Sequence, residues 1–302
     1  MRHRFNFLFP ILVVTFAFVA NGCSEAERAN KQAPLEAYIQ STLTAINAVD
    51  ATIEARVQAT MQAFTSPSPT VTATPQPTTP TPGGRLLSFA GYNWQVKSSE
   101  GQVGPGPNFF SDREEDVFVD AEGRLHLRIV NRDGQWFATE VVNTENLGYG
   151  LYTFHLVTPV DQLDPNIILG LFTWDDNAPQ ENYREIDIEF SRWSQPENDN
   201  AQYVVQPWQK SANIHRFNVV LGNQTSTHSF LWQPTGIIFQ SSYGDQTATS
   251  SPADIQSWVY GGDDNPPPGN ENVRINLWLN NGAAPIDEQD SEVIISNFTF
   301  TP

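Results

Sequence analysis

The stretch Arg184-Glu185-Ile186-Asp187-Ile188-Glu189-Phe190-Ser191-Arg192-Trp193 decides the fold, because it places a carboxylate at every second position with large apolar residues between them. In a β-strand, successive side chains point to opposite faces, so the three carboxylates and Trp193 share one face and the apolar residues share the other. On a helix the same residues would be scattered around the axis without an apolar stripe. The stretch therefore predicts a strand with one crowded acidic face.

The acidic face suits the cleavage of a glycosidic bond. A retaining glycosidase needs two carboxyl groups about 5–5.5 Å apart, and an inverting one needs about 6.5–9.5 Å. The Cα atoms of Glu185 and Glu189 would lie about 13 Å apart along a strand, so the side chains must lean together across Asp187. Close carboxylates cannot all ionise, so one keeps a proton and can act as the acid. A calcium site and a solvated acidic edge are the alternative interpretations.

The chain from residue 85 onwards consists of short alternating segments separated by Gly, Pro, Asn and Asp. This spacing, without a sustained helical period, is typical of a β-sandwich or barrel. The expected strands are 89–97, 116–120, 124–132, 136–143, 149–158, 166–174, 184–193, 201–208, 214–220, 226–233, 236–243, 254–260, 273–280 and 291–300.

Charge and composition limit the partners. The net charge of the 302 residues is −18, and residues 1–84 contribute nothing to it, because they hold five basic and five acidic residues. The acidic part repels nucleic acid and polyanionic glycans, and it suits a neutral or cationic partner. The sole cysteine is Cys23, which excludes an intrachain disulfide and a cysteine-based metal cluster.

The first residues resemble an export signal. Basic residues precede an apolar run from Phe5 to Ala20 that is short for a membrane span. The run ends in Ala20-Asn21-Gly22-Cys23-Ser24, which resembles a bacterial lipoprotein signal, although Ala20 stands where leucine is usual. Residues 1–22 are therefore expected to be removed and Cys23 to carry lipid, which anchors the exported protein to the membrane or cell surface. An ordinary signal peptide with a chance cysteine is the alternative.

Two segments separate this signal from the β-rich part. Apolar residues recur at steps of three and four from Leu35 to Phe64, which predicts one amphipathic helix. We interpret residues 23–64 as an anchor and stalk in which the 35–64 helix pairs chains, with a specific docking helix as the alternative. Residues 65–84 are rich in Pro, Thr and Ser and form an extended linker, so residues 85–302 are the expected catalytic domain.

Several motifs of the β-rich part are similar to one known family. Glu185-Ile186-Asp187-Ile188-Glu189 followed by Phe190 resembles the catalytic signature of glycoside hydrolase family 16, in the unbulged form found in its lichenases and xyloglucan transglycosylases. The resemblance covers roughly residues 89–300 and implies a concanavalin-like β-jelly-roll sandwich of two antiparallel sheets that cuts β-glucans with retention. Other matching strands contain Gly148-Tyr149-Gly150-Leu151-Tyr152, Leu171-Phe172-Thr173-Trp174, Trp232-Gln233-Pro234 and Asn276-Leu277-Trp278.

The resemblance implies roles for individual residues. Glu185 would be the nucleophile, Asp187 would assist it and modulate the acid, and Glu189 would be the acid/base. No cofactor is required, and family members can bind a structural calcium ion. The positions that face the family's cleft are Glu140, Gln202, Asn276 and Trp278. Independently of the family, tryptophans on the acidic face and on neighbouring strands are candidates for sugar stacking, although each one alone is more typical of a core or rim: Trp174, Trp193, Trp208 and Trp278.

The substrate is where the sequence departs from the family. Tyr183-Arg184 stands where lichenases have Trp-Asp, Val142 replaces a cleft arginine, Val204 replaces an asparagine, and the residues after the signature also differ. The expected function is an endo-β-glucanase that hydrolyses a neutral 1,3- or 1,4-linked β-glucan. A glycan-binding surface protein without turnover and a transglycosylase are the alternatives.

Overall fold

The computed structural model describes residues 84–244 and 254–302. The predicted signal, Cys23, the 35–64 helix and almost all of the linker lie outside the described residues. Within the described ranges, no helix is long and apolar enough to cross a membrane. The regular elements of the described part are strands and short 3-10 turns, as the sequence predicts for an all-β fold.

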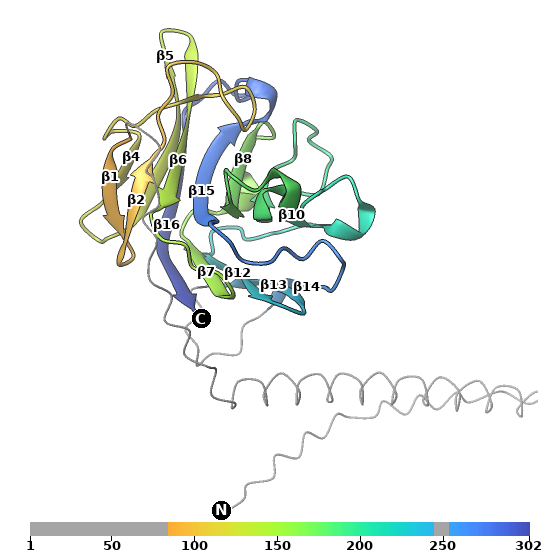
Figure 1. The fold of residues 1–302 in the computed structure, drawn as a ribbon. Helices are drawn as coiled ribbons and strands as arrows, with labels where there is room; N and C mark the ends of the chain where they lie inside the picture. Colours follow the sequence, from red (N-terminus) through yellow and green to blue (C-terminus); the bar gives the residue numbers. More distant parts are fainter. Residues whose placement is uncertain (1–83, 245–253) are drawn as a thin grey trace, which may run out of the picture. The chain divides into compact units, whose positions relative to one another are not determined.

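Two antiparallel layers make up the fold (Figure 1). We call the layer that contains the acidic strand the front sheet. Its strands, in spatial order, are β11 (Ile214–Phe217), β10 (Ala201–Val205), β9 (Ile186–Phe190), β8 (Ile167–Trp174), β15 (Asn272–Leu279), β6 (Gln135–Asn143), β2 (Tyr92–Val96) and β1 (Leu86–Phe89).

The back sheet covers the other side of the core. Its order is β4 (Val117–Val119), β5 (Leu125–Arg132), β16 (Ser291–Thr301), β7 (Gly150–Leu156), β12 (Ser226–Gln233), β13 (Gly236–Tyr243) and β14 (Asp254–Tyr260). The β5–β6 hairpin joins the two sheets, and the short β3 (Phe109–Phe110) runs parallel to β6. The 3-10 turns are η1 (Val160–Gln162), η2 (Pro179–Arg184), η3 (Ser211–Asn213) and η4 (Asn280–Gly282).

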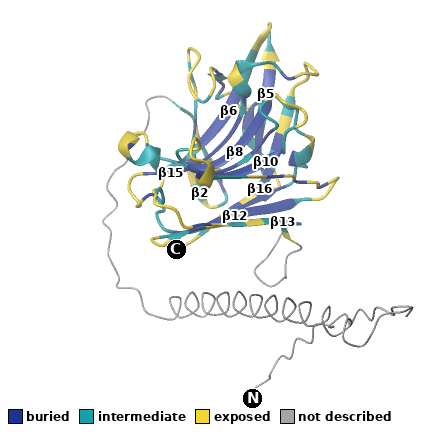
Figure 2. Ribbon diagram, turned by 90° about the vertical axis from the view of Figure 1, so that its right-hand side faces the viewer, coloured by how far each residue is buried: buried dark blue, intermediate teal, exposed yellow. Residues whose placement is uncertain are grey.

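The core lies between the sheets and fixes which face of β9 looks outward. Ile186, Ile188 and Phe190 are fully buried in it, and the central strands of the front sheet are buried over most of their length (Figure 2). Burial of a large apolar side chain stabilises the fold by about 1.5–3 kcal/mol. A slip of one residue would move the carboxylates into the core. The apolar half of the alternation therefore holds the acidic half on the outer face of the front sheet.

The structure corrects the predicted strand 184–193 at both ends. Strand β9 starts at Ile186, because Asn182, Tyr183 and Arg184 have positive φ angles of 48°, 57° and 54° and belong to η2. It ends at Phe190, and Trp193 has a φ of 48°, so strand alternation does not set the direction of its side chain.

The predicted strand 89–97 is also wrong as one element. Phe89 is the last residue of β1, and β2 begins at Tyr92. The two strands form a hairpin that turns at Ala90 and Gly91, with φ angles of 53° and 82°. The short strand β3 has no counterpart among the predicted strands.

Candidate active site

The acidic face of β9 lies in the middle of the front sheet. Glu189 is paired in register with Gly170 of β8 and Gln202 of β10. Asp187 is paired with Phe172 and Val204 in the next row. Glu185 directly precedes the strand, and its carbonyl oxygen accepts a hydrogen bond of 3.1 Å from the backbone N–H of Gln206.

A cavity of about 270 Å³ opens over these rows, and we call it the cleft. All three carboxylates of the signature line it together, as the sequence predicts for a catalytic arrangement. Four of the predicted substrate-binding residues also line it: Glu140, Trp174, Asn276 and Trp278.

Burial raises the pKa of all three carboxyls, and repulsion adds to the rise at Glu185 and Asp187. Burial, and secondarily the charge of Glu189, raises the pKa of Glu185 to about 8. Burial, followed by the charges of Glu185 and Glu189, raises the pKa of Asp187 well above its usual value. A hydrogen bond joins the Glu185 and Asp187 carboxyls; it raises the pKa of Asp187 and lowers that of Glu185, so Asp187 donates the proton. Near neutral pH the group therefore holds at least one proton.

Glu189 has a different environment from Glu185. Burial raises its pKa, but the Gln202 side chain and the charge of Arg216 both counteract this rise. The Gln202 Nε2 donates to Glu189 Oε2 at 2.6 Å, and Arg216 Nε donates to Gln202 Oε1 at 3.1 Å. Gln202, predicted to bind substrate, thus orients Glu189 and does not line the cleft. These contacts reduce the rise but do not cancel it, so the pKa of Glu189 stays above its usual value.

Two of the predicted stacking residues lie outside the cleft lining. The guanidinium of Arg216 lies 4.8 Å from the ring centroid of Trp193 and covers one face of that ring. Trp208 is 56% exposed, and its backbone N–H donates to the side chain of Gln206. Gln206 in turn donates to Asp187 Oδ2 at 3.1 Å. Trp208 is thereby connected to β9 through Gln206.

The floor of the cleft contains a buried carboxylate, Glu140, which is only 1% exposed. Lys97 Nζ donates to its Oε2 at 3.0 Å, Asn276 Nδ2 donates to the same oxygen at 3.3 Å, and Arg274 Nη1 lies 3.6 Å from Oε1. Glu140 Oε1 and Asn276 Oδ1 have no hydrogen-bond partner. These two buried acceptors therefore lack a hydrogen bond beside the cleft.

An aromatic pair stands at the Glu185 end of the cleft. Trp174 stacks on Tyr183 with ring centroids 4.2 Å apart, and its Nε1 donates to Asp176 Oδ1 at 2.8 Å. Asp176 also accepts a hydrogen bond of 2.7 Å from Arg274. The ring of Trp174 is thus held in place by neighbours on two sides.

Arg184, one of the departures from the family, does not line the cleft. Its Nε lies 3.2 Å from Asp175 Oδ2, and its Nη1 donates to the carbonyl oxygen of Pro267. Its carbonyl oxygen accepts a hydrogen bond of 2.8 Å from the Thr173 hydroxyl, which also receives the N–H of Ile186. Arg184 therefore ties the turn before Glu185 to two neighbouring segments.

Some residues that line the cleft are not among the site residues predicted from the sequence. The period-2 alternation could have found two of them, because Arg274 shares a strand face with Asn276 and Phe172 shares one with Trp174. The other lining residues reach the cleft through contacts between distant segments, which no local sequence pattern indicates. The additional lining residues are Lys97, Gly104, Pro105, Gly170, Phe172, Asp176 and Arg274.

The described residues contain no group of three or more His, Cys, Asp or Glu side chains that could hold a metal ion. The alternative interpretation of the three carboxylates as a calcium site thus has no support in this part of the chain. A structural calcium ion elsewhere stays a prediction.

Known proteins share this fold. No family model and no curated protein matches the sequence. Solved structures that match include a laminarinase from Flavobacterium sp. UMI-01, with 13% identity over 73% of this chain and 96% of that chain, and a TM-score of 0.53. An immunostimulatory antigen and pseudo β-1,3-glucanase of Mycobacterium tuberculosis has 17% identity over 69% and 91% of the two chains, and a TM-score of 0.52. These similarities confirm the expected jelly-roll fold and show the fold alone.

Proposed function

We propose that this protein is a retaining β-glycosidase that hydrolyses a neutral β-glucan. The observation that carries the proposal is the position of Glu185, Asp187 and Glu189, which all line one cavity together with Trp174 and Trp278. Carboxyls with raised pKa values in an aromatic-lined cleft are the groups that glycoside cleavage requires. The jelly-roll fold, which is shared with a laminarinase, is compatible with this function.

The residues divide the reaction into two steps. The Glu185 carboxylate attacks the anomeric carbon while Glu189 gives its proton to the departing glycosidic oxygen, which breaks the C–O bond. Glu189 then removes a proton from water, and the water oxygen displaces Glu185 and releases the sugar. Asp187 donates a hydrogen bond to Glu185 and so holds its carboxyl in place.

The resting protonation differs from the one that the first step requires. In the free protein, Glu185 holds its proton up to about pH 8, and burial raises the pKa of Glu189 against the lowering effects of Gln202 and Arg216. Attack by Glu185 requires that its carboxyl is ionised, with the proton on Glu189. We infer that the proton moves from the Glu185–Asp187 pair to Glu189 when a sugar enters the cleft.

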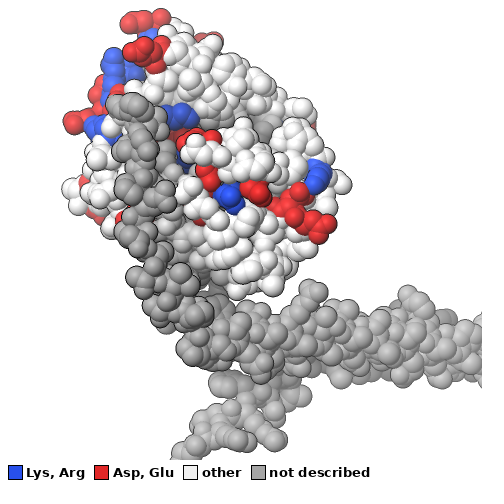
Figure 3. All heavy atoms as spheres, in the orientation of Figure 1, with Lys and Arg blue, Asp and Glu red and all other residues white. Residues whose placement is uncertain are grey.

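A neutral substrate fits the charges of the site. Each of the two cations that line the cleft, Lys97 and Arg274, contacts the carboxylate of Glu140. In Figure 3, acidic and basic side chains form a mixed band across the middle of the face, and the surface beside it is mostly uncharged. A polyanionic glycan would meet the acidic residues without a free cation among the residues that line the cleft.

The assay that tests this function uses a panel of polysaccharides. The full chain is incubated with mixed-linkage glucan, laminarin, xyloglucan and agarose, and the released oligosaccharides are identified by mass and linkage. We expect new reducing ends from at least one β-glucan. A glucan that is bound without any release over long incubation would instead favour the non-catalytic alternative. Diversion of product to an added acceptor oligosaccharide would favour the transglycosylase.

Export and lipid anchoring through Cys23 are part of the proposal. They rest on the apolar run and the sole cysteine at its end. We expect the protein in the membrane fraction of the producing cell and the Cys23→Ser variant outside it; equal fractionation of the two proteins would refute the lipid anchor.

A further inference from the structure

The rows of the front sheet lead from the catalytic strand to one end of the cleft. Glu189 is paired with Gly170, Gly170 with Asn276, and Asn276 with Glu140. Lys97 follows β2, and its backbone N–H donates to the carbonyl oxygen of Glu140 at 2.9 Å. The floor of the cleft therefore runs over β8, β15 and β6 before it reaches Lys97.

The side chain of Lys97 holds a loop over this end. Its Nζ donates to Glu140 Oε2 at 3.0 Å and to the carbonyl oxygen of Gly104 at 2.8 Å, and it lies 4.0 Å from the ring centroid of Phe110. Because one ammonium group contacts both oxygens, the carbonyl oxygen of Gly104 lies within about 6 Å of the Glu140 carboxylate. Gly104 and Pro105 accordingly line the cleft. We call residues 98–107 the end loop.

The end loop is fixed to the sheet at its far side. Val103 and Asn108 exchange two backbone hydrogen bonds of 2.8 and 3.0 Å, which close the tip of the loop. The buried side chain of Asn108 donates to the carbonyl oxygens of Pro105 at 2.9 Å and Leu279 at 2.8 Å, and it accepts the N–H of Leu279 at 3.2 Å. The end loop is thus anchored to the last residue of β15 as well as to Lys97.

The opposite direction from Glu189 leads to the edge of the sheet. The row passes Gln202 of β10 and Arg216 of β11, and β11 is the last strand on that side. Arg216 is exposed. A polymer that crosses Glu189 towards β11 reaches the exposed Arg216 and the ring of Trp193 that it contacts, whereas it meets Gly104 and Pro105 over β6.

We propose that the end loop closes the cleft over β6, so that the protein removes a short oligosaccharide from one end of a glucan chain. Three strand spacings of about 4.8 Å place Glu140 about 14 Å from Glu189, which leaves room for about two or three sugar rings. This inference rests on the proposed function and names its mode of action. It differs from the internal cleavage that the family resemblance implies.

The test compares product length and viscosity. The full chain is incubated with laminarin and with mixed-linkage glucan, and products are sampled from the first minutes onward. We expect one or two short oligosaccharides from the earliest samples, with little loss of viscosity. A variant in which an Asn-Gly turn replaces Gly104–Pro107 keeps the Val103–Asn108 pairing and removes Pro105. This variant should release longer products and reduce viscosity several times faster.

A second variant tests the anchor of the loop. Lys97→Met removes the ammonium that holds Gly104, and it should also lengthen the products. The matched control is Lys210→Met, because Lys210 pairs with Asp264 at 2.7 Å and does not line the cleft. Thermal unfolding of each variant checks that it is folded.

The possible outcomes separate this inference from the proposed function. A series of long products with rapid viscosity loss from the unmodified protein would refute the proposal that the end loop closes the cleft. It would leave the proposed function unaffected. Unchanged product lengths in both folded loop variants would do the same. Absence of hydrolysis of every β-glucan in the panel by the unmodified protein would overturn both proposals.

Discussion

Replacement of Glu185 by alanine is expected to reduce β-glucan hydrolysis by about a thousandfold or more, while the protein stays folded. Glu185 lies at the cleft and outside the hydrophobic core, so its removal leaves the packing of Ile186, Ile188 and Phe190 intact. It also removes the carboxylate that attacks the anomeric carbon in the proposed mechanism. Initial rates on the hydrolysed glucan measure the effect.

Azide rescue separates the roles of the two glutamates. The substrate is an aryl β-glycoside of a short glucan, whose leaving group needs little help from an acid. In Glu185→Ala, azide attacks from the face that the carboxylate occupied, so the product is the α-glycosyl azide. In Glu189→Ala, the glycosyl-enzyme still forms and azide displaces Glu185, so the product is the β-glycosyl azide.

The stereochemistry decides between two assignments. The pKa of Glu185 is raised to about 8, as suits an acid. The specific alternative is therefore that Glu185 is the acid and Glu189 the nucleophile. An α-glycosyl azide from Glu189→Ala would show that Glu189 is the nucleophile and Glu185 the acid. Glu292→Ala is the control, because Glu292 contacts His126 on the back sheet. Full activity of Glu185→Ala would contradict the mechanism altogether.

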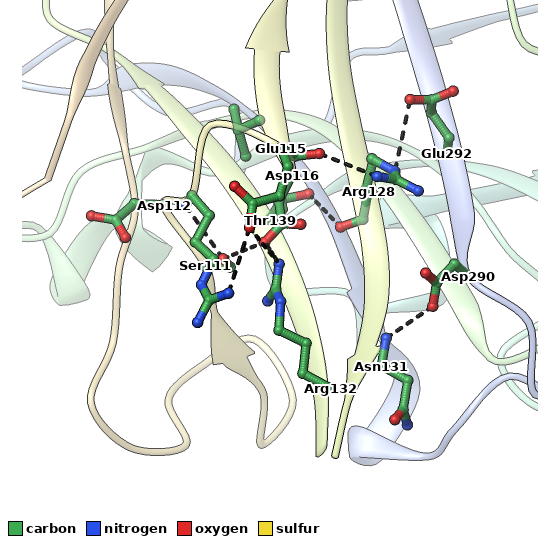
Figure 4. A network of polar contacts seen from close by, with 12 residues as sticks. Ser111, Asp112, Glu115, Asp116, Arg128, Asn131, Arg132, Thr139, Asp290 and Glu292 are labelled. Carbon is green, nitrogen blue, oxygen red and sulfur yellow. Dashed lines mark hydrogen bonds and ion pairs between the residues drawn. The ribbon is translucent and has the colours of Figure 1, made fainter. Parts of the chain in front are cut away.

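Replacement of Asp116 by alanine is expected to lower the free energy of unfolding by about 3–5 kcal/mol. Asp116 is fully buried and accepts hydrogen bonds from Arg132 and from the hydroxyl of Ser111 (Figure 4). Asp116 is the fully buried ion-pair partner of Arg132, whose own guanidinium is mostly buried. Without the Asp116 carboxylate, this guanidinium keeps only the ion pair with Glu115 at 3.9 Å. Urea unfolding measures the change.

Glu115→Ala is the matched control for this network. Its side chain is 61% exposed and contacts Arg113 at 3.5 Å and Arg132 at 3.9 Å, so its loss should cost less than about 1 kcal/mol. Asp116→Asn keeps the shape and removes the charge, and it should fall between the two. Equal stability losses for Asp116→Ala and Glu115→Ala would refute the importance of the buried pair.

The buried pair also concerns the cleft. Asp116 follows β3 by a few residues, and β3 continues directly from the end loop and pairs with β6. The network in Figure 4 therefore anchors the segment that follows the end loop, through the contact of Ser111 with Asp116. We expect Asp116→Ala to weaken this segment before it affects β9, which lies in the middle of the front sheet.

The period of the side chains made most of the fold predictable. Strands such as β12, β13 and β14 follow the expected ranges, because alternation and turn residues are local signals. The errors fall where backbone conformation breaks the period. The positive φ angles at Asn182, Tyr183 and Arg184 shorten β9, and no residue in that run is a glycine that would mark it.

The stretch from Arg184 to Trp193 by itself indicated that Glu185, Asp187 and Glu189 share one face opposite the apolar residues, because extended residues alternate between two faces. Only the tertiary structure decided what surrounds that face. The contacts of Gln202 and Arg216 with Glu189, and of Lys97 with Gly104, join segments far apart in the sequence. Such contacts depend on strand order and register across the sheet, which local periodicity does not encode. The sequence therefore indicates the chemistry, and the packing of distant segments sets the proton positions and the length of the cleft.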